Sequence, residues 1–222
     1  MLSYRYIKIA LDFFFPYRCP WCRDTSHAHA DSMICPKCFH AIQWSPGMWR
    51  STRVPIHCDS IHAAALFQGS LRSAIHEFKY NKQPFLAKSC AAVMLPFARG
   101  LPVPDLVIPV PLSRKRLRER RYNQSALLAR QLAKALDVSL ADDVVGRMHA
   151  DMNQVGLDAK ARWENVKSQF TVLHTAIAQI KDRRILLVDD VITTGATLNA
   201  LAQILKKSGA ASVHALTLGQ TV

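Results

Sequence analysis

The segment that most constrains the fold of this chain lies near its carboxyl end, from Ile185 to Thr197. It begins with four apolar residues, continues with two acids, Asp189 and Asp190, and ends in a short turn rich in threonine. A short apolar run is typical of a buried strand in a parallel sheet, and the ligands of such sheets bind beyond the carboxyl ends of the strands. We therefore predict that both acids lie at the open edge of a parallel sheet.

The turn that follows the acids has the composition of a phosphate site. Residues 193–197, Thr-Thr-Gly-Ala-Thr, present backbone N–H groups and hydroxyls at the start of an amphipathic helix, and such a helix start favours an anion. Carboxylates accept hydrogen bonds from sugar hydroxyls or hold a hydrated magnesium ion. A phosphorylated ribose satisfies both halves of the segment. The simpler alternative is a solvated strand end followed by an ordinary helix cap.

The whole segment resembles the phosphoribosyl pyrophosphate (PRPP) motif of type I phosphoribosyltransferases. The resemblance implies an α/β fold, with a parallel sheet flanked by helices, and a magnesium ion that accompanies PRPP. It also implies that Asp189 and Asp190 contact the two ribose hydroxyls, and that residues 193–197 hold the 5′-phosphate. The implied PRPP-binding residues beside the acids are Val191, Ile192, Thr193, Thr194, Gly195, Ala196 and Thr197.

A basic cluster is expected near the acids. Six of the eight residues 114–121 are arginine or lysine. They follow a second apolar strand, so the first of them should lie at the same sheet edge, where Arg114 and Lys115 can stabilise a diphosphate. With the two acids, these two residues form the candidate catalytic set. A solvated helix face is the alternative for the outer members, which we assign to nucleic-acid binding: Arg118, Arg120 and Arg121.

Two further lysines, Lys79 and Lys82, close a helix predicted from about Ser70 to Tyr80. Both complement the dipole of that helix, which is the simpler explanation for them. Contact with a diphosphate is the alternative.

Charge and composition are compatible with such a protein. The formal net charge is +13 at pH 7, and an excess of this size favours polyanionic partners. Apolar residues make up 50% of the 222 residues, which suits a soluble globule with a sizeable core. The apolar run from Ile7 to Phe15 contains two charged residues and is too short to cross a bilayer. We expect a cytoplasmic protein without membrane insertion.

Two cysteine pairs predict a structural zinc site in the amino-terminal region. Each pair is a Cys-x-x-Cys, and 12 residues separate the pairs, a spacing typical of a four-cysteine zinc knuckle. Redox-active pairs are the main alternative. Four thiolates complete a tetrahedron, so the metal should support folding rather than catalysis. We predict a zinc-binding subdomain over residues 1–55 and a phosphoribosyltransferase-like domain over residues 56–222, with the metal on Cys19, Cys22, Cys35 and Cys38.

The segment from Arg147 to Phe170 is the least regular part of the carboxyl-terminal half. Its polar residues suit either a plain solvated linker or a lid that excludes water from a reactive intermediate. The candidate lid residues are Gln154, Arg162 and Asn165.

The order of these features over nearly the whole chain looks like the ComF family of competence-associated, phosphoribosyltransferase-like proteins, which includes the GntX-like members. The resemblance implies a role in natural transformation, in which the protein handles incoming single-stranded DNA beside competence or recombination proteins. Members commonly have a glycine where this chain has Arg121.

Two classes of function remain open at this point. In an enzyme, an acceptor nucleophile would displace pyrophosphate from PRPP. In a binding module, the same fold would sense PRPP or a nucleotide, or bind DNA, without turnover. The sequence does not identify the acceptor.

Overall fold

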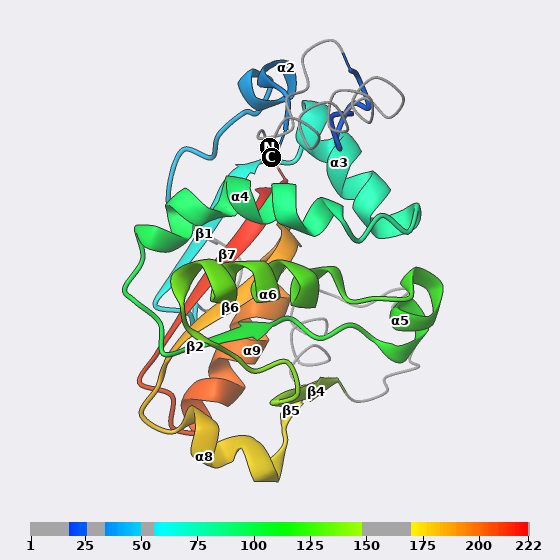
Figure 1. Ribbon diagram of the computed structural model, residues 1–222. Coiled ribbons are helices and arrows are strands. Elements are labelled where there is room, and N and C mark those ends of the chain that lie inside the picture. Colours follow the sequence, from blue (N-terminus) through cyan, green and yellow to red (C-terminus); the bar gives the residue numbers. More distant parts are fainter. Residues whose placement is uncertain (1–17, 26–33, 50–55, 148–169, 222) are drawn as a thin grey trace, which may run out of the picture.

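The computed structural model describes residues 18–25, 34–49, 56–147 and 170–221. Its centre is a five-stranded sheet with the order β1-β7-β6-β2-β3, in which every pairing is parallel. The strands are β1 (Ser60–Leu66), β2 (Leu106–Pro109), β3 (Ser139–Leu140), β6 (Arg184–Ile192) and β7 (Ser212–Gln220). The predicted α/β fold with a parallel sheet is confirmed (Figure 1).

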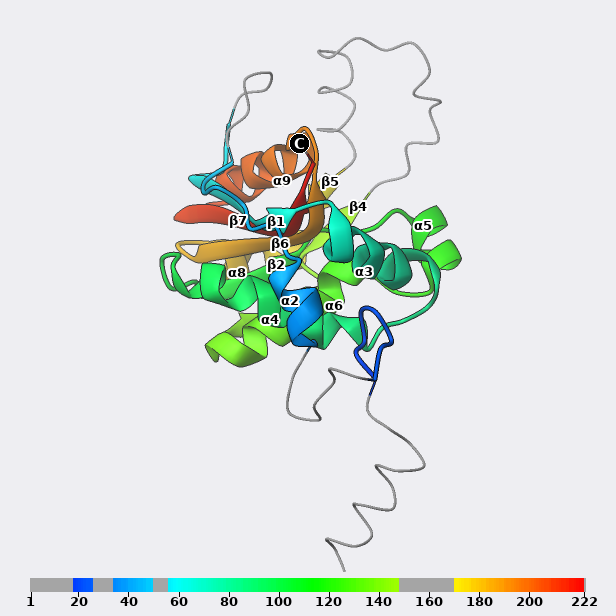
Figure 2. The same cartoon turned by 90° about the horizontal axis from the view of Figure 1, so that it is seen from above.

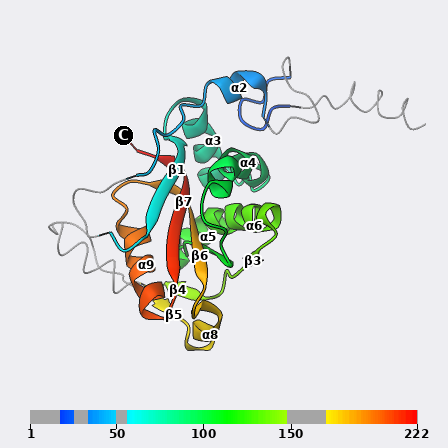
Figure 3. The ribbon, with the colours of Figure 1, turned by 90° about the vertical axis from the view of Figure 1, so that its left-hand side faces the viewer.

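Helices cover both faces of the sheet, as parallel strands require. One face carries α3 (Gly69–Tyr80), α4 (Leu86–Arg99) and α6 (Gln124–Leu136), and the other carries α9 (Ala196–Lys207). Figures 2 and 3 show the sheet between these layers. Alternate residues of β6 supply the two cores: Leu186 and Val188 pack on the side of α4 and α6, whereas Ile185 and Leu187 pack with α9.

The cysteine-containing segment packs against the helices of the first face. Its short helix α2 (Pro36–His40) follows Cys35. Trp21 Nε1 donates a hydrogen bond of 2.9 Å to Ser89 Oγ on α4, and Ser70 Oγ on α3 donates one of 3.2 Å to the carbonyl of Cys38. The buried residues of this segment share one core cluster with α3, α4 and α6.

The predicted lid lies outside the described residues. Two short strands, β4 (Val145–Arg147) and β5 (Phe170–Val172), pair antiparallel on either side of residues 148–169. The assignments of Gln154, Arg162 and Asn165 therefore remain predictions. After β5 come a 3-10 turn (His174–Ala176) and α8 (Ile177–Ile180).

None of the helices in the described part of the chain has the length and apolar character needed to cross a bilayer.

The basic cluster forms a helix that ends in a strained residue. α5 (Arg114–Arg120) starts at Ser113, whose side chain accepts a hydrogen bond from the backbone N–H of Arg116. It ends at Arg121, whose φ of 68° lies in the left-handed region. Glycine adopts this conformation at a helix end without the steric cost that a Cβ atom brings. A glycine at this position would suit the backbone better than arginine.

We therefore expect Arg121→Gly to stabilise the protein by about 0.5–1 kcal/mol, because the left-handed conformation no longer carries a Cβ penalty. Urea unfolding measures the change. Arg121→Ala is the matched control, since it also removes the exposed guanidinium but keeps the Cβ atom, and it should not stabilise. Equal stabilities of the two variants would mean that the backbone of Arg121 is not strained.

Candidate functional site

The two acids lie where β6 runs past its neighbour. β2 ends at Pro109, which pairs with Val188, so Asp189 and Asp190 have no partner on the β2 side. On the other side β7 accompanies β6 as far as Ile192. The acids are thus within the strand rather than after its last residue, a correction to the predicted boundary. They still lie at the carboxyl edge of the sheet, because β2 stops short of them.

Asp189 is held by the start of α6. Ser125 Oγ donates a hydrogen bond of 2.7 Å to Asp189 Oδ1, and the backbone N–H of Asp190 donates one of 2.8 Å to the same oxygen. Asn123 fixes this helix start, because its Oδ1 accepts from the Ser125 backbone and its Nδ2 donates to the Val110 carbonyl. Burial and the charge of Asp190 raise the pKa of Asp189 to about 7, although the Ser125 hydrogen bond opposes this shift.

Asp190 is held by α3. Lys79 Nζ, in the last turn of that helix, lies 2.9 Å from Asp190 Oδ1. Only 16% of the Lys79 side chain and 11% of the Asp190 side chain are exposed. From the sequence, the simpler explanation for Lys79 was that it complements the dipole of its own helix. That explanation does not account for the mostly buried ion pair that Lys79 forms with Asp190. The sequence offered a diphosphate contact as the alternative, but it did not indicate an ion pair with Asp190.

The predicted phosphate turn forms a small pocket next to Asp189. The pocket has a volume of about 40 Å³ and is lined by Asp189 and by every residue from Val191 to Leu198, so it includes all seven candidate PRPP-binding residues. Gly195, with φ of 72°, caps α9. A Cβ atom at Gly195 would come within 2.5 Å of the Trp49 ring. The segment that follows the cysteines therefore lies directly against this turn.

The basic residues of α5 differ in their surroundings. Arg114 and Lys115, in its first turn, and the outer residues Arg118 and Arg121 are exposed. Arg120 instead packs against other helices. Its guanidinium lies 5.3 Å from the centre of the Tyr80 ring, and its NH1 donates a hydrogen bond of 3.2 Å to Gln124 Oε1.

The four predicted zinc ligands form one cluster. Their Sγ atoms all lie within 4.8 Å of one another, and the Sγ atoms of Cys22 and Cys35 are 3.7 Å apart. A tetrahedral zinc ion with Zn–S bonds of about 2.3 Å separates its sulfur ligands by about 3.8 Å. Burial would raise the pKa of Cys19, but backbone N–H groups that include that of Cys35 lower it to about 7. The donor set and spacing fit zinc.

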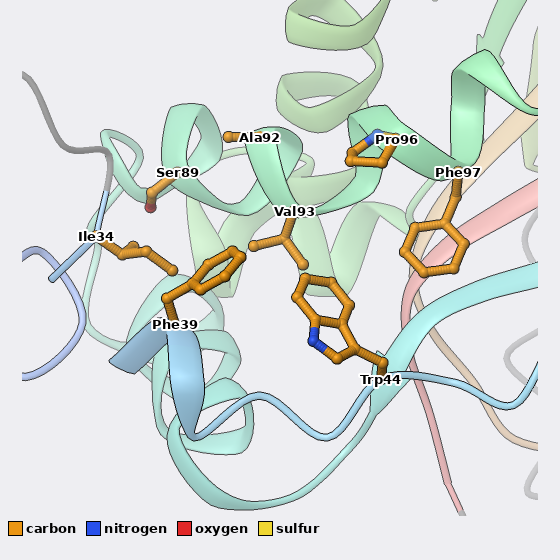
Figure 4. Close-up of a pocket in the computed structure, with 8 residues that line it drawn as sticks. All are labelled: Ile34, Phe39, Trp44, Ser89, Ala92, Val93, Pro96 and Phe97. Carbon is orange, nitrogen blue, oxygen red and sulfur yellow. The ribbon is translucent and has the colours of Figure 1, made fainter. Parts of the chain in front are cut away.

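A larger apolar pocket lies away from the acids, between α4 and the segment that contains α2 (Figure 4). Its volume is about 560 Å³. The Trp44 ring stacks on Phe97 at 6.1 Å and meets the edge of Phe39 at 5.6 Å. The lining has no charged group: Ile34, Phe39, Trp44, Ser89, Ala92, Val93, Pro96 and Phe97. This pocket cannot supply acid–base or phosphate chemistry.

Comparison with known proteins agrees with this arrangement. A model of the phosphoribosyl transferase domain matches residues 123–220. Competence protein F of Haemophilus influenzae is 32% identical over an alignment that covers 90% of this chain and 96% of that protein. The chain belongs to the ComF/YhgH family. A second relative is the DNA utilization protein YhgH of Shigella flexneri. It is 31% identical to this chain, and the alignment covers 86% of each chain.

Among solved structures, adenine phosphoribosyltransferase from Leishmania tarentolae matches with a TM-score of 0.40 and 15% identity, over 74% of this chain and 78% of that chain. The fold of the ComF/YhgH protein is phosphoribosyltransferase-like.

The raised pKa of Asp189 predicts how the stability of the ligand-free protein depends on pH. The folded-state pKa is about 7 and the unfolded value is about 4. Between these two pH values the Asp189 carboxyl is therefore protonated in the folded state and ionised in the unfolded state. The contribution of this group to the unfolding free energy therefore falls as the pH rises from about 4 to about 7. We expect Asp189→Asn to stabilise the protein at about pH 8, by up to a few kcal/mol, and to have little effect at about pH 4. Urea unfolding at both pH values tests this.

Asp105→Asn is a control of opposite sign. Hydrogen bonds from the Arg184 side chain and backbone hold the Asp105 carboxylate and keep its pKa well below its usual range. Its contribution to stability is present above the unfolded pKa and is lost only as the pH falls toward the folded value. This variant should be destabilised at pH 8, where Asp189→Asn is stabilised. Destabilisation of Asp189→Asn at pH 8 would contradict the burial argument.

Proposed function

We propose that this ComF/YhgH protein binds PRPP with magnesium at the edge formed by Asp189 and Asp190, and that it transfers the phosphoribosyl group to an acceptor. The observation that carries the proposal is the adjacency of two kinds of group. Asp189 lines the same small pocket as the turn at the start of α9, which suits a phosphate, and Asp190 is the next residue of β6, so that the pair can serve a vicinal diol. The order of these groups along one strand and one turn suits a ribose that carries a 5′-phosphate.

In the proposed reaction an acceptor nucleophile attacks the anomeric carbon of PRPP, and pyrophosphate leaves with the bonding electron pair. Positive charge develops on the ribose ring, and the neighbouring carboxylates favour it electrostatically. Arg114 and Lys115, at the start of α5, are the residues proposed to stabilise the leaving diphosphate. A bound magnesium ion would neutralise diphosphate charge. We assign no residue of the proposed site as a general base, so the proposal calls for an acceptor that is nucleophilic without being deprotonated by the protein.

A second candidate function is single-stranded DNA binding. The relatives are named as a competence protein and as DNA utilization proteins, and the net charge of +13 favours a polyanion. We propose that the exposed side of α5, with Arg118 and Arg121, and Arg120 beside it, contacts the DNA backbone in the cytoplasm. Competence or recombination proteins are the proposed partners. A silent PRPP sensor remains the alternative, and it would bind PRPP but release no pyrophosphate with any acceptor.

We also propose that the cysteine cluster holds one structural zinc ion. Purified protein should contain about one zinc per chain, as measured by metal analysis of protein prepared without chelator. Cys35→Ser should release the metal and expose the amino-terminal segment to protease, while the carboxyl-terminal domain stays resistant. Cys58→Ser, at a buried cysteine outside the cluster, is the control and should keep the metal. Protein without zinc would overturn this assignment.

One pair of variants tests the two anion sites. Replacing Asp189 and Asp190 together by Asn removes charge at nearly constant size, so PRPP affinity should fall by roughly 10-fold to 1000-fold. Affinity for single-stranded DNA should be unchanged. Reversing the charges of Arg118, Arg120 and Arg121 should do the opposite. It should weaken DNA binding and flatten its salt dependence, which is about −0.7 in log–log slope for each phosphate neutralised.

Calorimetric titration with PRPP and magnesium, beside DNA titrations at several salt concentrations, gives both affinities. Arg114→Ala with Lys115→Ala should reduce PRPP affinity more than DNA affinity. Normal PRPP binding by the double-acid variant would refute the PRPP site. Stoichiometric competition between PRPP and DNA would mean that both ligands bind at one shared anion site, and the proposal of two separate sites would be wrong.

A further inference from the structure

We propose that Lys79 and Ser125 are positioning residues of the ribose site, each of which fixes one carboxylate oxygen so that the other oxygen is left for a ribose hydroxyl. The inference rests on the proposed PRPP function and extends it to two helices, α3 and α6, that the PRPP motif does not include.

The two acids are held in the same way from different elements. Ser125, on α6, donates to Oδ1 of Asp189, and Lys79, on α3, forms its ion pair through Oδ1 of Asp190. Ser125 is 2% exposed and Asp190 is 8% exposed. Both contacts are thus fixed by the surrounding structure rather than by a chance encounter at a mobile surface.

The second oxygen of each carboxylate is available. Within the described residues, neither Asp189 Oδ2 nor Asp190 Oδ2 has a hydrogen-bond partner. In the described part of the chain, the fully buried side-chain polar atoms that lack a hydrogen-bond partner are Gln124 Nε2 and Asn199 Nδ2. The two Oδ2 atoms are not among them, so neither is fully buried. Both Oδ2 atoms therefore reach solvent, where they can accept hydrogen bonds from a diol.

The ion pair has a functional rather than a stabilising explanation. A buried ion pair gains little over well-packed apolar residues, because desolvation offsets its attraction, but removal of one partner leaves a costly unpaired charge. At this site, Lys79 offsets the repulsion between two neighbouring carboxylates and keeps Asp190 in one orientation. Two hydroxyls on adjacent ribose carbons need two acceptors at a fixed separation, so the orientation of both acids matters for affinity.

The inference is tested by ribose 5-phosphate and inorganic phosphate as paired probes, with PRPP and magnesium as the third ligand. Lys79→Met should weaken ribose 5-phosphate and PRPP binding by about 10-fold, as expected for a hydrogen-bonded charged group. It should leave inorganic phosphate binding unchanged, because phosphate contacts the turn and not the acids. Ser125→Ala should weaken ribose 5-phosphate binding about five-fold, as a neutral donor is lost.

Three further variants separate positioning from general damage. Lys79→Arg keeps the charge and should restore most of the affinity. Lys82→Met removes an exposed lysine close to the same helix end and should bind ribose 5-phosphate like the wild type. In the Asp190→Asn background, Lys79→Met should cause less than about a two-fold further loss, because its target is gone.

The outcomes distinguish this inference from the PRPP proposal. If the wild type does not bind PRPP, or if the double-acid variant binds it normally, the PRPP site itself is refuted. If the double-acid variant loses binding but Lys79→Met and Ser125→Ala bind ribose 5-phosphate normally, the positioning role is refuted. Should Lys79→Met fail to fold, Lys79→Gln replaces it, and normal ribose 5-phosphate binding by Lys79→Gln and Ser125→Ala refutes the role equally.

Discussion

Two carboxylates on consecutive residues of a mostly buried strand are the constraint on which the site depends. Like charges in a poorly solvated position repel each other and raise the pKa of one of the pair, as found for Asp189. A hydroxyl donor from α6 and an ammonium group from α3 contact the two acids and offset this repulsion. β2 stops at Pro109, and the acids lie beyond its end, where the two helices contact them. A longer β2 would cover the edge proposed to bind ligand.

The parts of the site that are contiguous in the chain were predictable from sequence. The apolar strand, the acids and the threonine-rich turn follow one another from Ile185 to Thr197, and local pattern suffices to order them along a sheet edge. The contact of Lys79 with Asp190 was not predictable, because the dipole of its own helix already explained a lysine there. The contact of Ser125 with Asp189 was not predictable either, because Ser125 lies in an alanine-rich helix. Their contacts join distant parts of the chain.

The cysteine cluster shows the same division between local and distant information. Spacing within and between the pairs predicted which sulfur atoms meet, because each pair is a local turn. It did not predict that Trp21 and Cys38 tie the cluster to α4 and α3. These contacts join the cluster to the core on that face of the sheet, so the amino-terminal segment packs directly against the phosphoribosyltransferase-like domain.

The contact between Trp49 and Gly195 makes one position in the turn intolerant of substitution for two separate reasons. Its left-handed backbone excludes most side chains, and the indole excludes even a methyl group. Any larger residue there would require Trp49 to move away from the turn. The same proximity places an indole, whose emission responds to nearby charge, beside the turn that would receive an anion. The protein thus carries its own optical reporter of that turn.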